Sequence, residues 1–176
     1  MRVPSFDATT ATCRIFTFKE GALSAVAHDL ELAVDRFAIV VADDQAIDAT
    51  FQAGSLRVLH AVKDGRASDA LSANDKQKIA RSIADDVLHS ARFPEIRFRS
   101  SSVTAAGTGF AIAGELTLHG KARPLQVTTR LEGSMQVAEV RLHQPDFGIK
   151  PYSAMLGTLK VKADLKVRIA VPWPAS

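Results

Sequence analysis

The side chains of this sequence that could bind a transition metal or transfer protons are, first of all, its five histidines. They are spread along the chain as His28, His60, His89, His119 and His143. No two have the spacing that lets one helix or strand hold a metal ion, so the sequence predicts no metal site. His28 precedes Asp29, but adjacent residues of a strand point to opposite faces and form no dyad. His119 precedes Gly120, and we expect it in a hairpin turn.

Nucleophilic catalysis has little support. Cys13 is the only cysteine, so no intramolecular disulfide can form, and the strand-like segment 11–18 around it is typical of a buried apolar side chain. The chain has no Gly-x-Ser-x-Gly motif, no glycine-rich phosphate loop and no carboxylate pair in an apolar setting. We therefore expect no enzyme activity and no cofactor other than a bound lipid or isoprenoid. An enzyme that uses His28 or His119 inside the fold is the alternative.

The charges exclude several classes of partner. Lysine and arginine number 22 against 19 acidic residues, and the basic residues occur singly, without the interleaved aromatic residues of nucleic-acid-binding proteins. We expect no nucleic-acid partner. The longest apolar run, 37–42, is too short for a membrane-spanning helix, so no integral membrane segment is expected. Residues 1–7 lack the apolar core of an export signal, which predicts a cytoplasmic protein, or a periplasmic one if a signal has been removed.

Alternation of apolar and polar residues with a period of two is the main structural signal. It is clearest at 159–171, which predicts one long strand with an apolar face and a charged face. The same pattern predicts strands around 96–99, 110–118 and 125–131, and further strands are expected at about 10–18, 22–34, 37–42, 46–58 and 135–143. Turn signals such as Lys19-Glu20-Gly21 and Ala106-Gly107 separate them.

These strands predict an all-β fold, an antiparallel barrel of about eight strands. A chain of 176 residues with 47% apolar residues is expected to form a single domain, residues 1–176. A barrel of this size can be filled by its own side chains or can hold one small ligand. Small residues on the inward phase, at Gly114, Ala53, Ser100, Ala138 and Ala163, are consistent with an internal void or with the taper of a solid barrel.

One segment departs from the strand pattern. Between about 74 and 89, Ile79, Ile83 and Val87 recur every four residues, which predicts one inserted amphipathic helix. Asn74 with Gln77 is the expected start, and Pro94 excludes its continuation. The helix covers either the mouth of the barrel or its outer wall. The polar segment 61–73 before it has no period and is predicted to be a mobile loop.

Four short segments, taken in order, carry a family resemblance. They are Leu-Ser-Ala-Val-Ala-His at 23–28 with Phe37, Phe-Pro-Glu-Ile-Arg-Phe-Arg-Ser-Ser at 93–101, Gly-Glu-Leu-Thr-Leu-His-Gly-Lys-Ala-Arg-Pro-Leu at 114–125, and Asp-Phe-Gly-Ile at 146–149. Together they resemble the YceI family. The third segment, similar to the family's hairpin Gly-x-Leu-Thr-x-His-Gly followed by a basic residue and proline, is the strongest motif. The likeness covers about residues 10–171.

This resemblance implies an elongated lipocalin-like barrel whose tunnel binds polyisoprenoid-type lipids. It implies that seven residues also selected by the alternation line the tunnel, and we add Phe147 of the fourth segment as a predicted ligand contact. The eight predicted tunnel residues are Ile96, Phe98, Phe110, Ile112, Leu116, Leu118, Val127 and Phe147.

We therefore expect a protein that binds or carries a hydrophobic, lipid-like small molecule: an isoprenoid, a quinone-like molecule or a fatty acyl chain. Burial of such a chain is favourable by about 0.8 kcal/mol per methylene group. The second hypothesis is a structural or interaction protein with a filled barrel and no ligand, and the enzyme that uses His28 or His119 is the third. Whether the protein forms a homodimer stays open.

Overall fold

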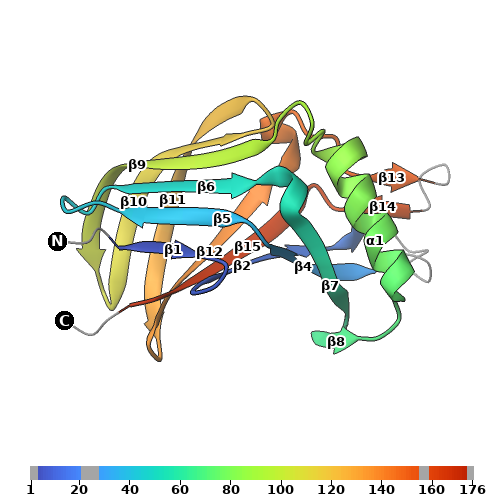
Figure 1. The fold of residues 1–176 in the computed structure, drawn as a ribbon, viewed down its shortest axis with the longest axis horizontal. Helices are drawn as coiled ribbons and strands as arrows, with labels where there is room; N and C mark the ends of the chain where they lie inside the picture. Colours follow the sequence, from blue (N-terminus) through green and yellow to red (C-terminus); the bar gives the residue numbers. More distant parts are fainter. Residues whose placement is uncertain (1–3, 21–27, 155–158, 174–176) are drawn as a thin grey trace.

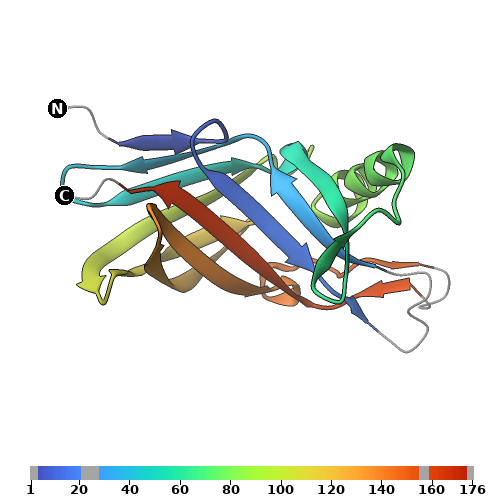
Figure 2. The same cartoon turned by 90° about the horizontal axis from the view of Figure 1, so that it is seen from below.

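The computed structural model describes residues 4–20, 28–154 and 159–173. Most of these residues lie in antiparallel strands that curl into an elongated barrel with one helix at one end (Figures 1 and 2). The predicted all-β class with one inserted helix is therefore confirmed. Of the predicted strand at 22–34, residues 21–27, and with them most of the first family segment, lie outside the described residues.

The main sheet has twelve strands, in which neighbours are hydrogen-bonded and antiparallel. In spatial order they are β1 (Ser5–Asp7), β5 (Phe37–Val41), β6 (Ile47–Gln52), β9 (Glu95–Ala106), β10 (Gly109–Leu118), β11 (Lys121–Glu132), β12 (Met135–His143), β15 (Asp164–Pro172), β2 (Thr12–Thr17), β4 (Asp29–Val34), β7 (Leu56–Lys63) and β8 (Arg66–Ser68). A smaller sheet joins β13 (Ser153–Ala154), β14 (Leu159–Val161) and β3 (Lys19–Glu20). The described part of the chain thus has more strands than the expected eight.

Part of this difference is a break in the segment 46–58, which was expected to be one strand. A short 3₁₀ turn, Ala53–Ser55, separates β6 from β7. The turn is stabilised from outside, because the Ser55 hydroxyl accepts a hydrogen bond from the Arg36 N–H at 3.0 Å and the Ala53 N–H donates to the Pro94 carbonyl at 2.9 Å. The chain therefore leaves β6, which pairs with β9, and enters β7, which pairs with β4.

The segment 159–171 is also two strands rather than one. Between β14 and β15 the Lys162 N–H donates to the Phe18 carbonyl and the Ala163 carbonyl accepts from the Gln144 N–H, both at 2.8 Å. These bonds divert the backbone from the small sheet into the main sheet. The side-chain alternation continues across the break, since Val161 and Leu165 both face the interior cavity, and the sequence pattern therefore shows no interruption.

The segment 61–73 was predicted to be an irregular loop, but its first eight residues form the turn end of a hairpin. Strand β7 extends to Lys63 and pairs with β8 across the two-residue turn Asp64-Gly65. Both turn residues have positive φ, 51° and 74°, which is the conformation that an Asp-Gly hairpin turn favours. The Asp64-Gly65 turn signal was present in the sequence, but the polar residues around it do not alternate with apolar ones, so the two strands were not predicted.

The predicted helix is present as α1 (Ala73–Ser82), followed by a π-helical turn at Ile83–Val87. Its start differs from the expected Asn74 and Gln77. Ser72 is the N-cap: its hydroxyl accepts from the Asp75 N–H at 3.1 Å and the Asp75 carboxylate accepts from the Ser72 N–H at 3.0 Å. This is a capping box, which satisfies two otherwise unpaired N–H groups. Among the described residues, no helix is long and apolar enough to cross a membrane.

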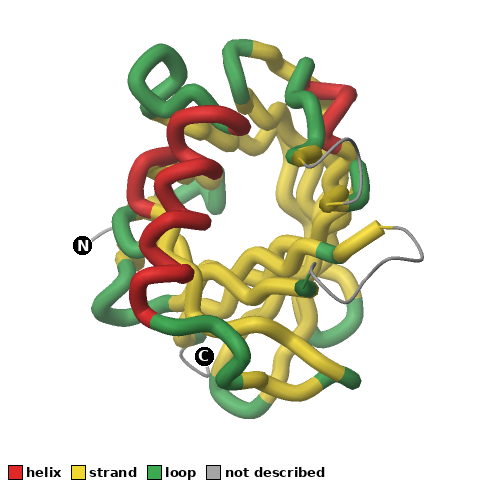
Figure 3. The backbone as a smooth tube through the Cα atoms, turned by 90° about the vertical axis from the view of Figure 1, so that its right-hand side faces the viewer, coloured by secondary structure: helices red, strands yellow, loops and turns green. Residues whose placement is uncertain are grey.

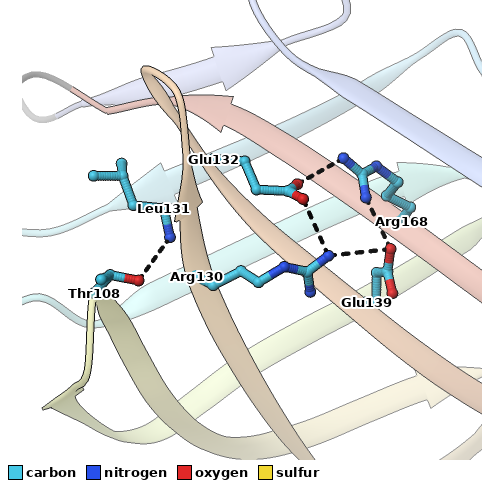
Figure 4. Close-up of polar contacts among 6 residues, drawn as sticks. All are labelled: Thr108, Arg130, Leu131, Glu132, Glu139 and Arg168. Carbon is cyan, nitrogen blue, oxygen red and sulfur yellow. Dashed lines mark hydrogen bonds and ion pairs between the residues drawn. The ribbon is translucent and has the colours of Figure 1, made fainter.

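The outer face of β11, β12 and β15 carries a network of ion pairs (Figure 4). Arg168 contacts Glu132 at 2.7 Å and Glu139 at 2.8 Å, and Arg130 contacts the same carboxylates at 3.3 and 3.4 Å. The Arg168 guanidinium holds the pKa of Glu139 below its ordinary value. The two arginines and two glutamates pair with one another, so this part of the outer face carries no net charge.

Candidate ligand-binding cavity

The inner faces of the strands enclose a cavity of about 600 Å³. Its wall consists of inward-facing side chains from β2, β4–β7, β9–β12 and β15, with α1 and the following turn at one end. A volume of this size lies within the range of about 300 to 1,000 Å³ that is typical of small-molecule sites. The barrel is therefore hollow.

All eight residues predicted to line the tunnel lie on this wall. Strand β9 contributes Ile96 and Phe98, β10 contributes Phe110, Ile112, Leu116 and Leu118, β11 contributes Val127, and the 3₁₀ turn Gln144–Phe147 contributes Phe147. Phe98, Ile112, Leu116, Leu118 and Phe147 are buried, whereas Ile96, Phe110 and Val127 are only partly buried although they belong to the same core cluster. Their partial exposure fits side chains that border the cavity. Their contact with a ligand stays a prediction.

The other half of the wall was not singled out in the sequence. It comes from β2, β4, β6, β12 and β15, and the alternation within these strands could have identified it, because every second residue points inward. Examples of these additional wall residues are Cys13, Ile15, Leu30, Leu32, Val34, Ala49 and Phe51. The helix adds residues from the same spacing that predicted it, including Ile79, Ile83 and Val87.

The small residues that were expected to point inward do not all enlarge the cavity. Ala53 and Ala138 line the cavity. Gly114, by contrast, lies at a β-bulge where a Cβ atom would come within 2.5 Å of the Phe98 ring. Ser100 uses its hydroxyl to accept from the Ile47 N–H at 2.8 Å. Only part of the set therefore enlarges the interior, and Gly114 instead makes room for Phe98.

The end of the barrel at the β9–β10 and β11–β12 hairpins, here called the far end, contains an aromatic contact and internal hydrogen bonds. The rings of Phe110 and Trp173 meet edge to face at 5.4 Å. The buried Gln136 accepts from the Thr129 hydroxyl at 2.8 Å and donates to the Thr108 carbonyl at 2.9 Å. Both polar atoms of the Gln136 amide are thus paired within the protein.

The opposite end, here called the helix end, is where α1, β13 and β14 lie (Figure 3). The apolar side chains of α1 extend a second core cluster formed by β4 and β7, with Ile79, Ala80 and Ile83 packed against it. The helix also contributes Lys78, Ile79, Ser82 and Ile83 to the cavity wall. Of the two positions open from the sequence, the helix therefore occupies the mouth of the barrel.

The candidate catalytic residues are not brought together. Burial raises the pKa of the Cys13 thiol to about 12, so this side chain stays protonated at neutral pH. His28 lies on the exposed rim of the cavity. His119 lies in the β10–β11 turn, as predicted, with φ of 54°, and its ring packs 4.5 Å from that of Phe93, away from the cavity wall. No cluster of metal-binding side chains occurs within residues 4–20, 28–154 and 159–173.

The comparisons with known proteins agree with this architecture. The model of the YceI-like domain matches residues 6–172. The chain belongs to the YceI-like family. A relative described as a UPF0312 protein from Shewanella denitrificans is 30% identical in an alignment of length 126 that covers 60% of this chain. The alignment spans 63% of that relative, less than two thirds of its length.

Solved structures share the YceI-like fold at low sequence identity. BcnA of Burkholderia cenocepacia has a TM-score of 0.64 at 16% identity, covering 94% of this chain and 97% of its own. A polyisoprenoid binding domain from Saccharophagus degradans has a TM-score of 0.58 at 9% identity, covering 98% and 100%. The YceI protein of Campylobacter jejuni has a TM-score of 0.60 at 13% identity, covering 82% and 84%. These likenesses confirm the lipocalin-like fold.

Proposed function

We propose that this YceI-like protein binds or carries a hydrophobic, lipid-like molecule, such as an isoprenoid, a quinone-like molecule or a fatty acyl chain, in its barrel. The observation that carries the proposal is the continuous apolar wall of a cavity of about 600 Å³. A polar ligand would lose its hydration there without gaining hydrogen bonds, whereas a hydrocarbon chain gains about 0.8 kcal/mol per buried methylene group. The polyisoprenoid-binding domain with the same fold supports this assignment.

The proposal includes neither a catalytic step nor a cofactor. Among residues 4–20, 28–154 and 159–173, none that lines the wall is an aspartate or glutamate, and burial of Cys13 raises the pKa of its thiol to about 12, which favours the neutral form. The same function is proposed for either compartment, cytoplasm or periplasm, because it depends on the interior of the barrel and not on the surroundings of the protein.

The first experiment is native mass spectrometry of freshly purified protein, followed by extraction and identification of any released molecule. A stoichiometric adduct that extracts into organic solvent is expected, and the same spectrum gives the oligomeric state. An unmodified mass that persists after incubation with isoprenoids, quinones and fatty acids would instead favour the alternative, a structural or interaction protein without a ligand.

Variants of the cavity wall test the location of the ligand. Leu116→Glu and Ile112→Arg place a charge inside the cavity and should abolish lipid retention. Thr117→Glu is the matched control, because it is the next residue of β10 and lies outside the cavity wall, and Lys162→Glu is a second control. Equal retention by all four variants would contradict the proposal.

A buried charge can also unfold the barrel. Circular dichroism and thermal unfolding therefore accompany each retention assay. Ala138→Phe narrows the cavity without adding a charge, and it should reduce retention in a protein that stays folded.

A further inference from the structure

Charged side chains on the cavity wall are all of one sign. Among the described residues that line the cavity, only Lys78 and Lys160 are charged at neutral pH irrespective of histidine protonation, and no aspartate or glutamate is present. The rest of the wall is almost entirely apolar. The charged groups that an occupant of this apolar cavity would meet on the described wall are therefore cations.

Both lysines lie at the helix end, although they are far apart in the sequence. Lys78 belongs to α1 and Lys160 to β14, and these elements border the same end of the barrel (Figures 1 and 3). Ser82 and Tyr152, which can both donate hydrogen bonds through their hydroxyl groups, line the cavity there as well. The helix end therefore combines two cations with two neutral donors.

Two carboxylates lie near these lysines without forming an ion pair with them in the described part of the chain, although Lys78, after the hydrogen bonds with Ser72, helps to lower the pKa of Asp75. Asp75, one helical turn before Lys78, accepts from the Ser72 N–H in the capping box. Glu20 is the cross-strand neighbour of Lys160 in the small sheet. Within the described part of the chain, neither lysine has a carboxylate oxygen within 4.0 Å, whereas Arg97, Arg130 and Arg168 on the strands of the main sheet do.

The far end has no lysine or arginine on the described cavity wall, although Gln45 of the β5–β6 turn lines the cavity there with a neutral amide. Phe110 and Trp173 pack together there, and the amide of Gln136 is already bonded to Thr129 and Thr108. A long ligand with one polar terminus would therefore place its hydrocarbon chain toward the far end and its polar terminus at the helix end.

We propose that the ligand of this cavity carries an anionic head group, a carboxylate or a phosphate, which lies at the helix end that Lys78 and Lys160 border. This inference rests on the proposed function, the binding of a lipid-like molecule. It narrows the ligand from hydrophobic molecules in general to amphiphiles with a single hydrocarbon chain and a negative head, and it disfavours neutral quinones.

Matched probes with the same hydrocarbon chain test this inference on the intact protein. Palmitic acid and hexadecyl phosphate carry the two anionic heads, and hexadecanol is the neutral probe. Both anions should bind about tenfold or more tightly than the alcohol, because charge-assisted hydrogen bonds are about twice as strong as neutral ones. The affinity of the anions should fall with salt, since both lysines are exposed.

The lysine variants identify the residues responsible. Lys78→Gln and Lys160→Gln should each weaken binding of the anions, and the double variant should bind them no better than hexadecanol. Lys162→Gln is the control, because this exposed lysine is a near neighbour of Lys160 in the sequence but lies outside the cavity wall. Glu20→Gln should strengthen binding of the anions, since it removes a negative charge beside Lys160.

The outcomes separate the two proposals. Stronger binding of the carboxylate assigns fatty acids and stronger binding of the phosphate assigns alkyl or prenyl phosphates; either result supports the inference. If hexadecanol binds as tightly as the anions and the lysine variants change nothing, the anionic head group is wrong while lipid binding stands. If none of the three probes binds, the inference fails, and the incubation with isoprenoids and quinones then decides whether the proposed function stands.

Discussion

Gly114 shows how closely the inner wall is packed at the level of single residues. It lies at the bulge between β9 and β10, and an added methyl group would meet both the Phe98 ring and the Arg99 carbonyl. We predict that Gly114→Ala lowers the free energy of unfolding by about 1 to 3 kcal/mol, the usual cost of overpacking.

Chemical denaturation measures this effect, and Gly54 supplies the control. A Cβ atom at Gly54 would meet nothing nearer than the Ser90 hydroxyl oxygen at 3.7 Å, which is ordinary contact. Gly54→Ala should therefore leave stability nearly unchanged. A Gly114→Ala variant as stable as Gly54→Ala would mean that β9 and β10 can separate without cost.

Cys13 gives a pH-dependent prediction. Burial raises the pKa of its thiol from 9.0 to about 12, so above pH 9 the unfolded chain loses a proton that the folded protein retains. The contribution of Cys13 to stability is therefore constant below pH 9 and decreases as the pH rises from about 9 to 12. Unfolding of wild type and Cys13→Ala, compared at each pH, isolates this contribution from that of lysine and tyrosine. A difference between the two proteins that does not change with pH would contradict the burial of the thiol.

At the level of elements, the capping box of Ser72 and Asp75 stabilises the N-terminus of α1, the helix that borders the cavity mouth. None of the residues of α1 is buried, so its stability depends strongly on its N-terminus. Ser72→Ala should destabilise the helix by about 1 kcal/mol. Faster amide exchange in α1 and faster release of the bound lipid are expected, because the helix lines the mouth.

Asn74→Ala is the matched control for this change. Asn74 was the start expected from the sequence, but it lies inside the first turn of α1. Alanine should be tolerated there, because it favours helix more than asparagine does. If Asn74→Ala and Ser72→Ala accelerate exchange equally, Ser72 has no special role as the N-cap.

The elements also show what local sequence patterns can predict. The four-residue spacing of Ile79, Ile83 and Val87 predicted the helix, and alternation predicted the faces of β9 and β10, because both signals repeat along one element. The breaks at Ala53–Ser55 and at Lys162 were missed. They depend on hydrogen bonds to Arg36, Pro94 and Phe18, which are distant in the sequence. Likewise, no local signal brings Lys78 and Lys160 to the same mouth.

At the level of the whole molecule, a barrel with an internal cavity can hold a ligand, but it is less stable without the ligand than a barrel with a filled core. Partly buried inner residues such as Val127 and Val167 lose contacts that a filled core would provide. We predict that Ala138→Phe raises the stability of the protein without lipid while it weakens lipid binding. Thermal unfolding with and without palmitic acid measures both effects.

In wild type, a ligand at 100 times its dissociation constant should stabilise the fold by about 2.7 kcal/mol. Ala138→Phe should show a smaller gain. Thr117→Phe is the control. Thr117 belongs to β10 but does not line the cavity, so this variant should retain the full stabilisation by the ligand. If the added ring destabilises the protein without lipid, the cavity near Ala138 is too narrow to be filled.

The position of β15 in the main sheet has a consequence for biosynthesis. This strand lies between β12 and β2 and pairs with both, so it joins an early and a late part of the chain. The ribosome makes β15 after every other strand of the sheet, and until then β2 and β12 both have an unpaired edge. The inner apolar face is exposed to the cytosol or to a chaperone during this time. The main sheet is therefore complete only after residue 172 has been synthesised, and a shorter chain leaves two unpaired strand edges, which favour aggregation.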